Sequence, residues 1–361
     1  MSATQRRPRL TTGAGATKVV GVGSPPGLDP ARLQAYLREH RPDLAAGETS
    51  ASLIPGGRSN LTYEVHSGDR SYVLRRPPLG HVLATAHDMG REFRVISALA
   101  GTPVPVPEAY LLCADADVIG APFYLMQRVP GEVYRSRDQT DLLTASQRQA
   151  MVDNMMDTLA ALHTVDPAGV GLADFGHPEG FLARQVRRWS QQLDRSRSRD
   201  LPGADELRDR LAASVPTSGP GRVVHGDYRL DNMLIDPASM RIEAVLDWEM
   251  ATLGDPLADL GLLLTYWQVV SSTDNPVADR LGPQAGFPTA EALLDRYARR
   301  TGTDPAQLDW YVALGCYKLA VICEGIHYRY TLGQTVGAGF DRMGDMVQPL
   351  IDHGLRALGE Q

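Results

Sequence analysis

The sequence predicts an α+β fold of two lobes, in which short strands come first and helices follow. From residue 52 to residue 129, short runs of alternating apolar and polar residues are separated by turn residues. From about residue 151 the apolar residues recur at helical spacing instead. Strands and helices segregated along the chain favour α+β over an alternating α/β arrangement. The length of 361 residues suits two domains or one two-lobed protein.

The expected elements follow in chain order. Residues 1–27 are rich in Gly, Pro, Ser, Thr and Arg without periodicity, which predicts a disordered tail. Asp29-Pro30 is a strong helix start, because Asp caps helices well and Pro suits the first helical position. We expect an N-lobe over residues 28–129, with strands at 52–55, 61–66, 71–76, 109–113 and 123–129 and a helix at 87–99. Residues 130–361 are expected to form a mostly helical C-lobe.

Composition excludes several classes of protein. A formal net charge of −7 argues against a nucleic-acid partner, which would require clustered positive charge. No apolar run is long enough to span a membrane. The three cysteines form neither a paired framework nor a metal-binding spacing, so free thiols in a reducing cytoplasm are expected. Only two lysines, Lys18 and Lys318, are present, and neither follows the glycine pattern of a P-loop.

One polar loop carries the residues expected to perform chemistry. An apolar strand leads into His225-Gly226-Asp227, and Asn232 follows five residues after Asp227. A second apolar strand, residues 242–246, leads directly to Asp247. Phosphoryl transfer from a magnesium nucleotide needs a carboxylate that accepts the proton of the attacking hydroxyl, plus an amide oxygen and a second carboxylate that hold the metal. A plain polar turn between two strands is the alternative interpretation of the same pattern.

This loop, together with Asp247-Trp248-Glu249, resembles the aminoglycoside phosphotransferase and choline kinase family. The resemblance covers residues 52–329 and implies a protein-kinase-like fold that binds ATP and Mg²⁺. It also implies catalytic roles for Asp227, Asn232 and Asp247, with metal bound by Asn232 and Asp247. The matching branch is the kinase-like domain found fused to, or encoded near, acyl-CoA dehydrogenases, which shares the run Val-Leu-Arg-Arg-Pro-Pro at residues 73–78.

Kinases place a lysine on the strand at residues 71–76, where this chain has Arg75. Glu92, on the helix that follows, is its natural carboxylate partner. Arginine can hold the nucleotide phosphates and pair bidentately with a carboxylate, although its reach differs from that of lysine. The exchange leaves two interpretations open: a variant phosphate-binding residue in a working kinase, or a pseudokinase that binds nucleotide without transfer. A surface arginine is the simpler alternative for Arg75.

Two further segments are expected to contact the nucleotide. The turn Pro55-Gly56-Gly57-Arg58-Ser59-Asn60 brings glycine N–H groups, and the side chains of Ser59 and Asn60, toward an anion. The strand ending at Val129-Pro130-Gly131 resembles the link between lobes in the family. By that resemblance Met126 lines the adenine pocket, while the carbonyl of Gln127 and the N–H of Val129 meet the adenine edge. Ordinary hairpin and strand roles are the alternatives.

The remaining candidates support the loop or line an acceptor pocket. His225, Asp255 and Asp259 are expected to be structural, because a buried carboxylate such as Asp259 must find hydrogen-bond donors. Tyr328 and Arg329 lie on a C-terminal helix, where the family builds its acceptor pocket. Their aromatic and basic character suits an acceptor carrying a carboxylate or phosphate better than a polycationic aminoglycoside. The alternative is that this aromatic stripe belongs to the core.

Together these features predict a cytoplasmic kinase that moves the γ-phosphoryl group of ATP to a hydroxyl of a small molecule, such as a hydroxy acid or its acyl thioester. An acyl-CoA dehydrogenase is disfavoured, because the chain has no flavin-binding fingerprint. The acceptor, the choice between ATP and GTP, and the oligomeric state stay open.

Overall fold

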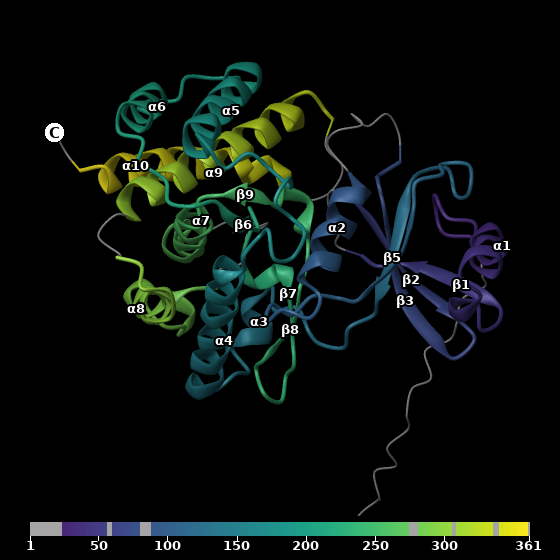
Figure 1. Ribbon diagram of the computed structural model, residues 1–361. Helices are drawn as coiled ribbons and strands as arrows, with labels where there is room; N and C mark the ends of the chain where they lie inside the picture. Colours follow the sequence, from purple (N-terminus) through teal and green to yellow (C-terminus); the bar gives the residue numbers. More distant parts are fainter. Residues whose placement is uncertain are drawn as a thin grey trace, which may run out of the picture.

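The computed structural model describes residues 24–55, 60–79, 88–273, 281–304, 308–334 and 339–359. Within them, a five-stranded antiparallel sheet lies at one end of the molecule and a mostly helical lobe at the other, which confirms the expected two-lobe α+β fold (Figure 1). No helix in these ranges is long and apolar enough to cross a membrane.

The sheet has the strand order β1-β2-β3-β5-β4, and every neighbouring pair is antiparallel. Its strands are β1 (Thr49–Leu53), β2 (Leu61–Ser67), β3 (Arg70–Arg76), β4 (Ala109–Cys113) and β5 (Phe123–Gln127). The strand expected at residues 52–55 therefore begins three residues earlier. The chain crosses from β3 to β4 through α2 (Met89–Leu99), and β5 then inserts between them.

Alternation along β5 divides the core into two layers. Phe123 and Leu125 face the layer that contains α1 (Pro30–His40), while Tyr124 and Met126 face the layer shared with α2 and the helical lobe. Figure 1 shows α1 and α2 on opposite sides of the sheet. As expected from the sequence, Asp29 caps α1, and its Oδ1 accepts a hydrogen bond from Ala31 N–H at 2.9 Å.

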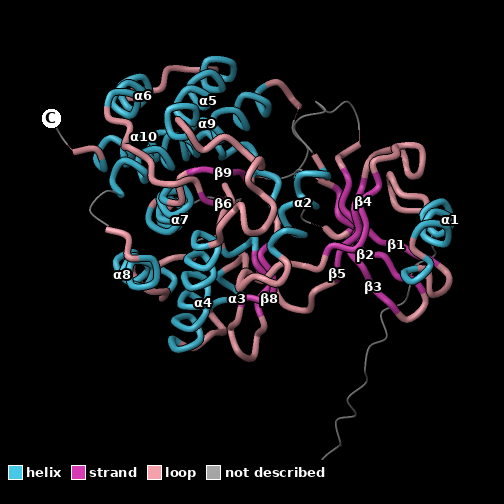
Figure 2. The backbone as a smooth tube through the Cα atoms, in the orientation of Figure 1, coloured by secondary structure: helices cyan, strands magenta, loops and turns pink. Residues whose placement is uncertain are grey.

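The helical lobe is organised around α9 (Leu308–Thr331), which contacts α5, α6, α7 and α10. Residues on all sides of α9 are buried, as in a helix at the centre of a core. Figure 2 shows α9 beside α5, α6 and α10. The other helices of this lobe are α3 (Arg137–Thr140), α4 (Ala145–Thr164), α5 (Phe181–Ser196), α6 (Ala204–Ala213), α7 (Leu257–Gln268), α8 (Ala290–Thr301) and α10 (Val347–Ala357).

Two short antiparallel pairs lie between the sheet and these helices. They are β6 (Arg222–Val224) with β9 (Thr252–Gly254), and β7 (Met233–Ile235) with β8 (Ile242–Val245). The 3₁₀ turn η3 (Trp248–Met250) follows β8 and contacts α2. The loops of these pairs therefore lie where the two lobes meet.

The segment at residues 24–27, assigned to the tail from its composition, contacts the sheet. Tyr63 O–H donates a hydrogen bond to Pro26 O, and Arg76 donates one to Gly27 O. Residues 1–23 lie outside the described residues.

Candidate active site

The loop between β6 and β7 contains Asp227, and its backbone is tied to the strand end that carries Asp247. Leu246 N–H donates a 2.8 Å hydrogen bond to Asn232 O, so the residue before Asp247 lies against Asn232. His225 Nε2 lies 2.8 Å from Leu246 O, and His225 Nδ1 lies 3.2 Å from Asp227 N–H. These contacts assign the imidazole N–H to Nε2 and leave Nδ1 as an acceptor. The loop and the strand end are thereby joined through one histidine.

Two side chains fix the orientation of the Asp227 carboxylate. Asn232 Nδ2 donates to Asp227 Oδ2 at 3.2 Å and to the Asp227 carbonyl at 2.9 Å. Tyr266 O–H donates to Asp227 Oδ1 at 3.0 Å. Burial, with the Asp227 charge adding to it, raises the pKa of Tyr266, so the phenol remains a donor at neutral pH. Since each carboxylate oxygen accepts one hydrogen bond, lone pairs remain for an incoming hydroxyl.

Asp259, at the start of α7, stabilises the same loop from behind. Its Oδ2 accepts a hydrogen bond from His225 N–H at 2.6 Å, and its Oδ1 accepts one from Gly226 N–H at 2.8 Å. His163 Nε2 lies 3.3 Å from Asp259 Oδ2. Burial alone would raise the pKa of Asp259, but the hydrogen bonds from the His163 side chain and the His225 backbone help to lower it. Asp259 is therefore an ionised acceptor for two backbone N–H groups of the loop.

Gly226 has a backbone conformation that favours glycine. Its φ is +85°, and a Cβ there would lie 2.8 Å from both the Cβ and the carbonyl oxygen of Met250. Asp255, the other expected support residue, is buried, accepts from Tyr311 O–H at 2.9 Å and from Leu257 N–H at 3.0 Å, and so anchors the start of α7.

Arg75 lies between two carboxylates. Its Nη2 donates to Asp247 Oδ1 at 2.8 Å, and its Nε lies 3.0 Å from Glu92 Oε2 without pointing its N–H at that oxygen. Tyr124 O–H donates to Glu92 Oε2 at 2.8 Å. Burial disfavours the charged guanidinium, but Tyr124, Glu92 and Asp247 outweigh it and raise the pKa of Arg75. Arg75 is thus a permanent cation beside Asp247.

Asn60 belongs to this network rather than to an exposed loop. Its side chain is buried, and its Nδ2 donates to Glu92 Oε1 at 2.9 Å and to Glu249 Oε2 at 3.2 Å. Gly56, Gly57 and Ser59, expected with it on the phosphate loop, lie outside the described residues.

Asp247 has an unusual backbone. Its φ of 64° and ψ of 58° are left-handed, and Met240 is the only other non-glycine residue with positive φ in the described ranges. Non-glycine residues adopt this region at an energetic cost and are enriched in it at functional sites. The twist ends β8 and starts η3, which returns the chain toward α2.

The pair Asn232 and Asp247 has oxygen atoms that fit a hard cation. Asn232 Oδ1 and Asp247 Oδ2 accept no hydrogen bond from a described residue, and the Asp247 side chain is 33% exposed. No cluster of three or more His, Cys, Asp or Glu side chains suited to a metal occurs in the described ranges. Mg²⁺ usually takes one or two protein oxygens and completes its shell with phosphates and water, which this donor set allows.

Met126 is buried near the end of β5, and Gln127 N–H donates to Glu108 O at 2.8 Å. Val129 follows β5 and is partly buried, and its N–H makes no hydrogen bond to a described residue. A backbone donor is therefore open at the link between the lobes.

Tyr328 and Arg329 lie further along α9 than the residue that contacts the loop. They follow Lys318 by about ten residues on α9, which is about 15 Å of helix. Lys318 is the α9 residue that contacts the loop, since its Nζ donates to Gly226 O at 2.6 Å. Neither Lys318 nor Tyr266 was predicted from the sequence as a site residue. For Lys318 the available signal was the rarity of lysine in this chain.

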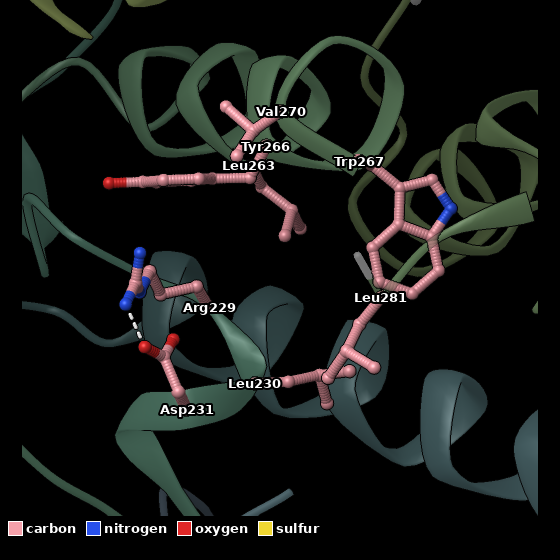
Figure 3. A pocket seen from close by; sticks show the side chains of 8 residues that line it. All are labelled: Arg229, Leu230, Asp231, Leu263, Tyr266, Trp267, Val270 and Leu281. Atoms are coloured by element: carbon pink, nitrogen blue, oxygen red, sulfur yellow. Dashed lines mark ion pairs between the residues drawn. The ribbon is translucent and has the colours of Figure 1, made fainter. Parts of the chain in front are cut away.

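A small cavity of about 40 Å³ lies beside Tyr266 (Figure 3). It is lined by Arg229, Leu230, Asp231, Leu263, Tyr266, Trp267, Val270 and Leu281. Arg229 forms an ion pair with Asp231, and its guanidinium lies 4.8 Å from the centre of the Tyr266 ring. These contacts hold the ring whose hydroxyl reaches Asp227.

A two-lobe fold with Asp227, Asn232 and Asp247 at the junction defines the class of kinase-like phosphotransferases. The model of the phosphotransferase enzyme family (APH) matches residues 50–311, and the chain belongs to this family.

Two similar proteins extend over most of the chain. Acyl-CoA dehydrogenase family member 11 of Rattus norvegicus is 35% identical over 90% of this chain, and the match spans 42% of that relative's length. A Ralstonia eutropha protein assigned as an aminoglycoside phosphotransferase has a solved structure with a TM-score of 0.79 and 32% identity, covering 92% of this chain and 99% of that one.

The fold also matches aminoglycoside phosphotransferase APH(4)-Ia, solved as a ternary complex with ADP and hygromycin B. The TM-score is 0.59 and the identity 18%, covering 91% of this chain and 99% of that one, so this likeness shows the fold alone.

Proposed function

We propose that this chain transfers the γ-phosphoryl group of ATP, with Mg²⁺, to a hydroxyl of a small molecule. The observation that carries the proposal is the convergence of Asp227, Asn232 and Asp247, tied together by the hydrogen bonds from Asn232 to Asp227 and from Leu246 to Asn232. A carboxylate held beside an amide and a second carboxylate is the set of groups that this chemistry uses.

Each residue then has one role. When bound, ATP would supply the phosphoryl group and Mg²⁺ would neutralise the negative charge of the phosphates. Asp227 orients the acceptor hydroxyl and takes its proton on the carboxylate held by Tyr266 and Asn232. The oxygens Asn232 Oδ1 and Asp247 Oδ2 would hold the metal. Asp259 keeps the loop in place, so that Asp227 does not have to reorganise during transfer.

For the nucleotide, we propose that Arg75 contacts the phosphates and that Glu92 orients the Arg75 side chain. The turn at residues 56–60 would cover the phosphates. Asn60 would then act through Glu92, which it contacts directly. Met126, the Gln127 carbonyl and the Val129 N–H would receive the adenine at the link between the lobes. The nucleotide-binding N-lobe would accordingly run from residue 28 to about residue 129, with the C-lobe following.

For the acceptor, we propose a hydroxy acid or its acyl thioester rather than an aminoglycoside. Similarity over most of the chain to a relative named as an acyl-CoA dehydrogenase supports this choice. The basic cavity beside Gly226, described below, supports it independently.

One observation favours a second candidate, a nucleotide-binding protein without transfer. Arg75 replaces the expected lysine and lies between Glu92 and Asp247, so two carboxylates compete with nucleotide phosphates for its charge. The presence of Asp227, Asn232 and Asp247 in one network weighs against this candidate.

The test is a transfer assay with the purified chain, ATP and Mg²⁺ against hydroxy acids, hydroxyacyl thioesters and aminoglycosides, alongside thermal shifts with the nucleotide. Acceptor-dependent ADP formation with a phosphorylated product supports the proposal. A thermal shift with nucleotide but no transfer to any acceptor supports the second candidate. Efficient phosphorylation of aminoglycosides alone would remove the acid or thioester from the proposal.

A further inference from the structure

A cavity of about 640 Å³ opens beside the catalytic loop, on the side of α5 and α9. Its walls include Gly226 from the loop, Lys318 from α9 and Trp189 from α5. Phe175 and Phe181 add apolar surface. The space is large enough for a small organic molecule beside Gly226, the residue that precedes Asp227.

Four cations line this cavity: Arg91, Arg184, Arg188 and Lys318. None of them forms an ion pair with a carboxylate of a described residue. Arg91, Arg184 and Lys318 instead donate hydrogen bonds to backbone carbonyl oxygens. Arg91 donates to the carbonyls of Phe175 and Ala251 at 2.9 and 3.1 Å, and Arg184 donates to those of Glu179 and His177.

Arg188 and Lys318 both make cation–π contacts with the ring of Trp189. Their charged groups lie 5.4 and 5.5 Å from the centre of its ring. Lys318 Nζ reaches Gly226 O, and burial lowers the pKa of Lys318, with Arg188 adding to that effect while Asp227 and Asp259 oppose it. Both charged groups therefore lie against one aromatic ring, and Lys318 also contacts the residue that precedes the proposed base.

The acidic residues of the cavity wall are all engaged elsewhere. Asp174 pairs with Arg94, Glu249 accepts from Asn60, and Asp259 accepts from the loop N–H groups. Among the described residues, none of the four cations is therefore in salt-bridge contact with a carboxylate, although the charges of Asp227 and Asp259 act on Lys318. In a chain with a formal charge of −7, this is a local concentration of cations that form no ion pair with a described residue.

We propose that Lys318 and Arg188, with Arg184 at the rim, form a subsite that binds an anionic group of the acceptor, a carboxylate or a phosphate, next to its reacting hydroxyl. The inference rests on the proposed function and adds a specificity determinant to it. The anion would relieve the repulsion between the two cations, and Trp189 would contact the apolar part of the same molecule. A polycationic acceptor would be repelled.

Two matched pairs of probes test the subsite and separate carboxylate from phosphate: 3-hydroxybutyrate against 3-hydroxybutyramide, and glycerol 3-phosphate against glycerol. Affinity is measured by calorimetry on the full chain with ADP and Mg²⁺ present, so that no turnover is needed. At least one anionic probe should bind about 10- to 100-fold more tightly than its neutral partner, the range for a hydrogen bond to a charged group. Raising the salt concentration should weaken only the anionic probe.

Lys318→Met and Arg188→Gln should each remove most of that difference, while Lys318→Arg should restore part of it. Arg187→Gln is the matched control, since Arg187 is exposed on the same helix and does not line the cavity. If Lys318→Met fails to fold, the Arg188→Gln variant alone tests the subsite, because Arg188 is exposed and its replacement should not affect folding.

Equal affinity within both pairs, including no measurable binding of any probe, would overturn the subsite. So would a difference that survives both substitutions. These outcomes are distinct from failure of the proposed function. If anionic probes bind more tightly but no phosphoryl transfer is detected, the subsite is supported and the kinase function is not. If transfer occurs without a preference for anionic probes, the kinase function is supported and the subsite is not.

Discussion

Two basic residues meet the catalytic machinery from opposite lobes, and their surroundings differ. Arg75, from the sheet, lies between Glu92 and Asp247. Among the described residues, Lys318, from α9, contacts the Gly226 carbonyl and an aromatic ring but forms no ion pair. A cation neutralised by two carboxylates mainly holds structure together until a ligand competes for it. A cation without a carboxylate is available to a ligand from the start. The difference is consistent with the proposal that the sheet side binds a metal–nucleotide and the α9 side an acidic acceptor.

The largest change to the sheet side should come from Asp247→Ala. It removes the proposed metal ligand and one partner of Arg75, so we expect Mg²⁺-dependent binding of ATP to be lost. Calorimetry with and without Mg²⁺ measures this directly. Glu243→Ala, on the neighbouring strand β8, is the control and should bind normally. Unchanged Mg²⁺ dependence in Asp247→Ala would remove Asp247 from the metal site.

Arg75→Met tests whether the sheet cation is structural. It leaves two carboxylates facing each other, and the side chains of Arg75 and Glu92 are only 11% and 2% exposed. Breaking such a buried pair costs about 3–5 kcal/mol, so the free energy of unfolding should fall by that order. Urea denaturation gives the value, with the half-exposed Arg128→Met as control. A loss below about 1 kcal/mol would mean that the network contributes little.

Asp259→Asn should weaken the loop. An amide offers one acceptor oxygen, so one of the two backbone N–H groups of His225 and Gly226 loses its partner, at a cost of about 1–3 kcal/mol. Because folding lowers the pKa of Asp259, its stabilisation is complete above the ordinary carboxyl value of about 4 and declines as the pH falls below it.

The gap in unfolding free energy between wild type and Asp259→Asn should therefore be constant from pH 7 to about pH 5 and narrow below about pH 4. A gap that widened on acidification would contradict the assigned direction.

Tyr266→Phe should have the smallest effect. It removes one hydrogen bond to Asp227 Oδ1, worth about 0.5–1.5 kcal/mol, so kcat/KM should fall about 2- to 10-fold without a change in nucleotide affinity. Tyr330→Phe, exposed at the end of α9, serves as the control. A loss as large as that from removing the base itself would mean that Tyr266 does more than orient Asp227.

The local elements were predictable because their signals are local. Asp29-Pro30 marked the start of α1, alternation marked β2 and β3, and the spacing from Asp227 to Asn232 marked the loop. The left-handed backbone of Asp247 had no such signal, since aspartate adopts ordinary conformations far more often.

Contacts between distant segments were harder to foresee. Asn60 was expected at the phosphates from its glycine-rich neighbours, but its amide is directed to Glu92 and Glu249, residues 32 and 189 positions away. Lys318 and Tyr266 read as ordinary helix residues, because their positions relative to Asp227 depend on how α7 and α9 pack. The assignment of Tyr328 and Arg329 to an acceptor pocket stays a prediction, since both lie on α9 beyond Lys318.

Asp227→Asn compared with wild type tests the central claim most directly, with turnover and nucleotide affinity measured on the same preparations. The substitution keeps the shape of the side chain and removes its ability to take a proton. We predict that phosphoryl transfer falls by about 10²–10⁴-fold while the dissociation constant for ATP with Mg²⁺ stays within a few-fold of wild type. Turnover comparable to wild type would contradict the assignment of Asp227 as the base.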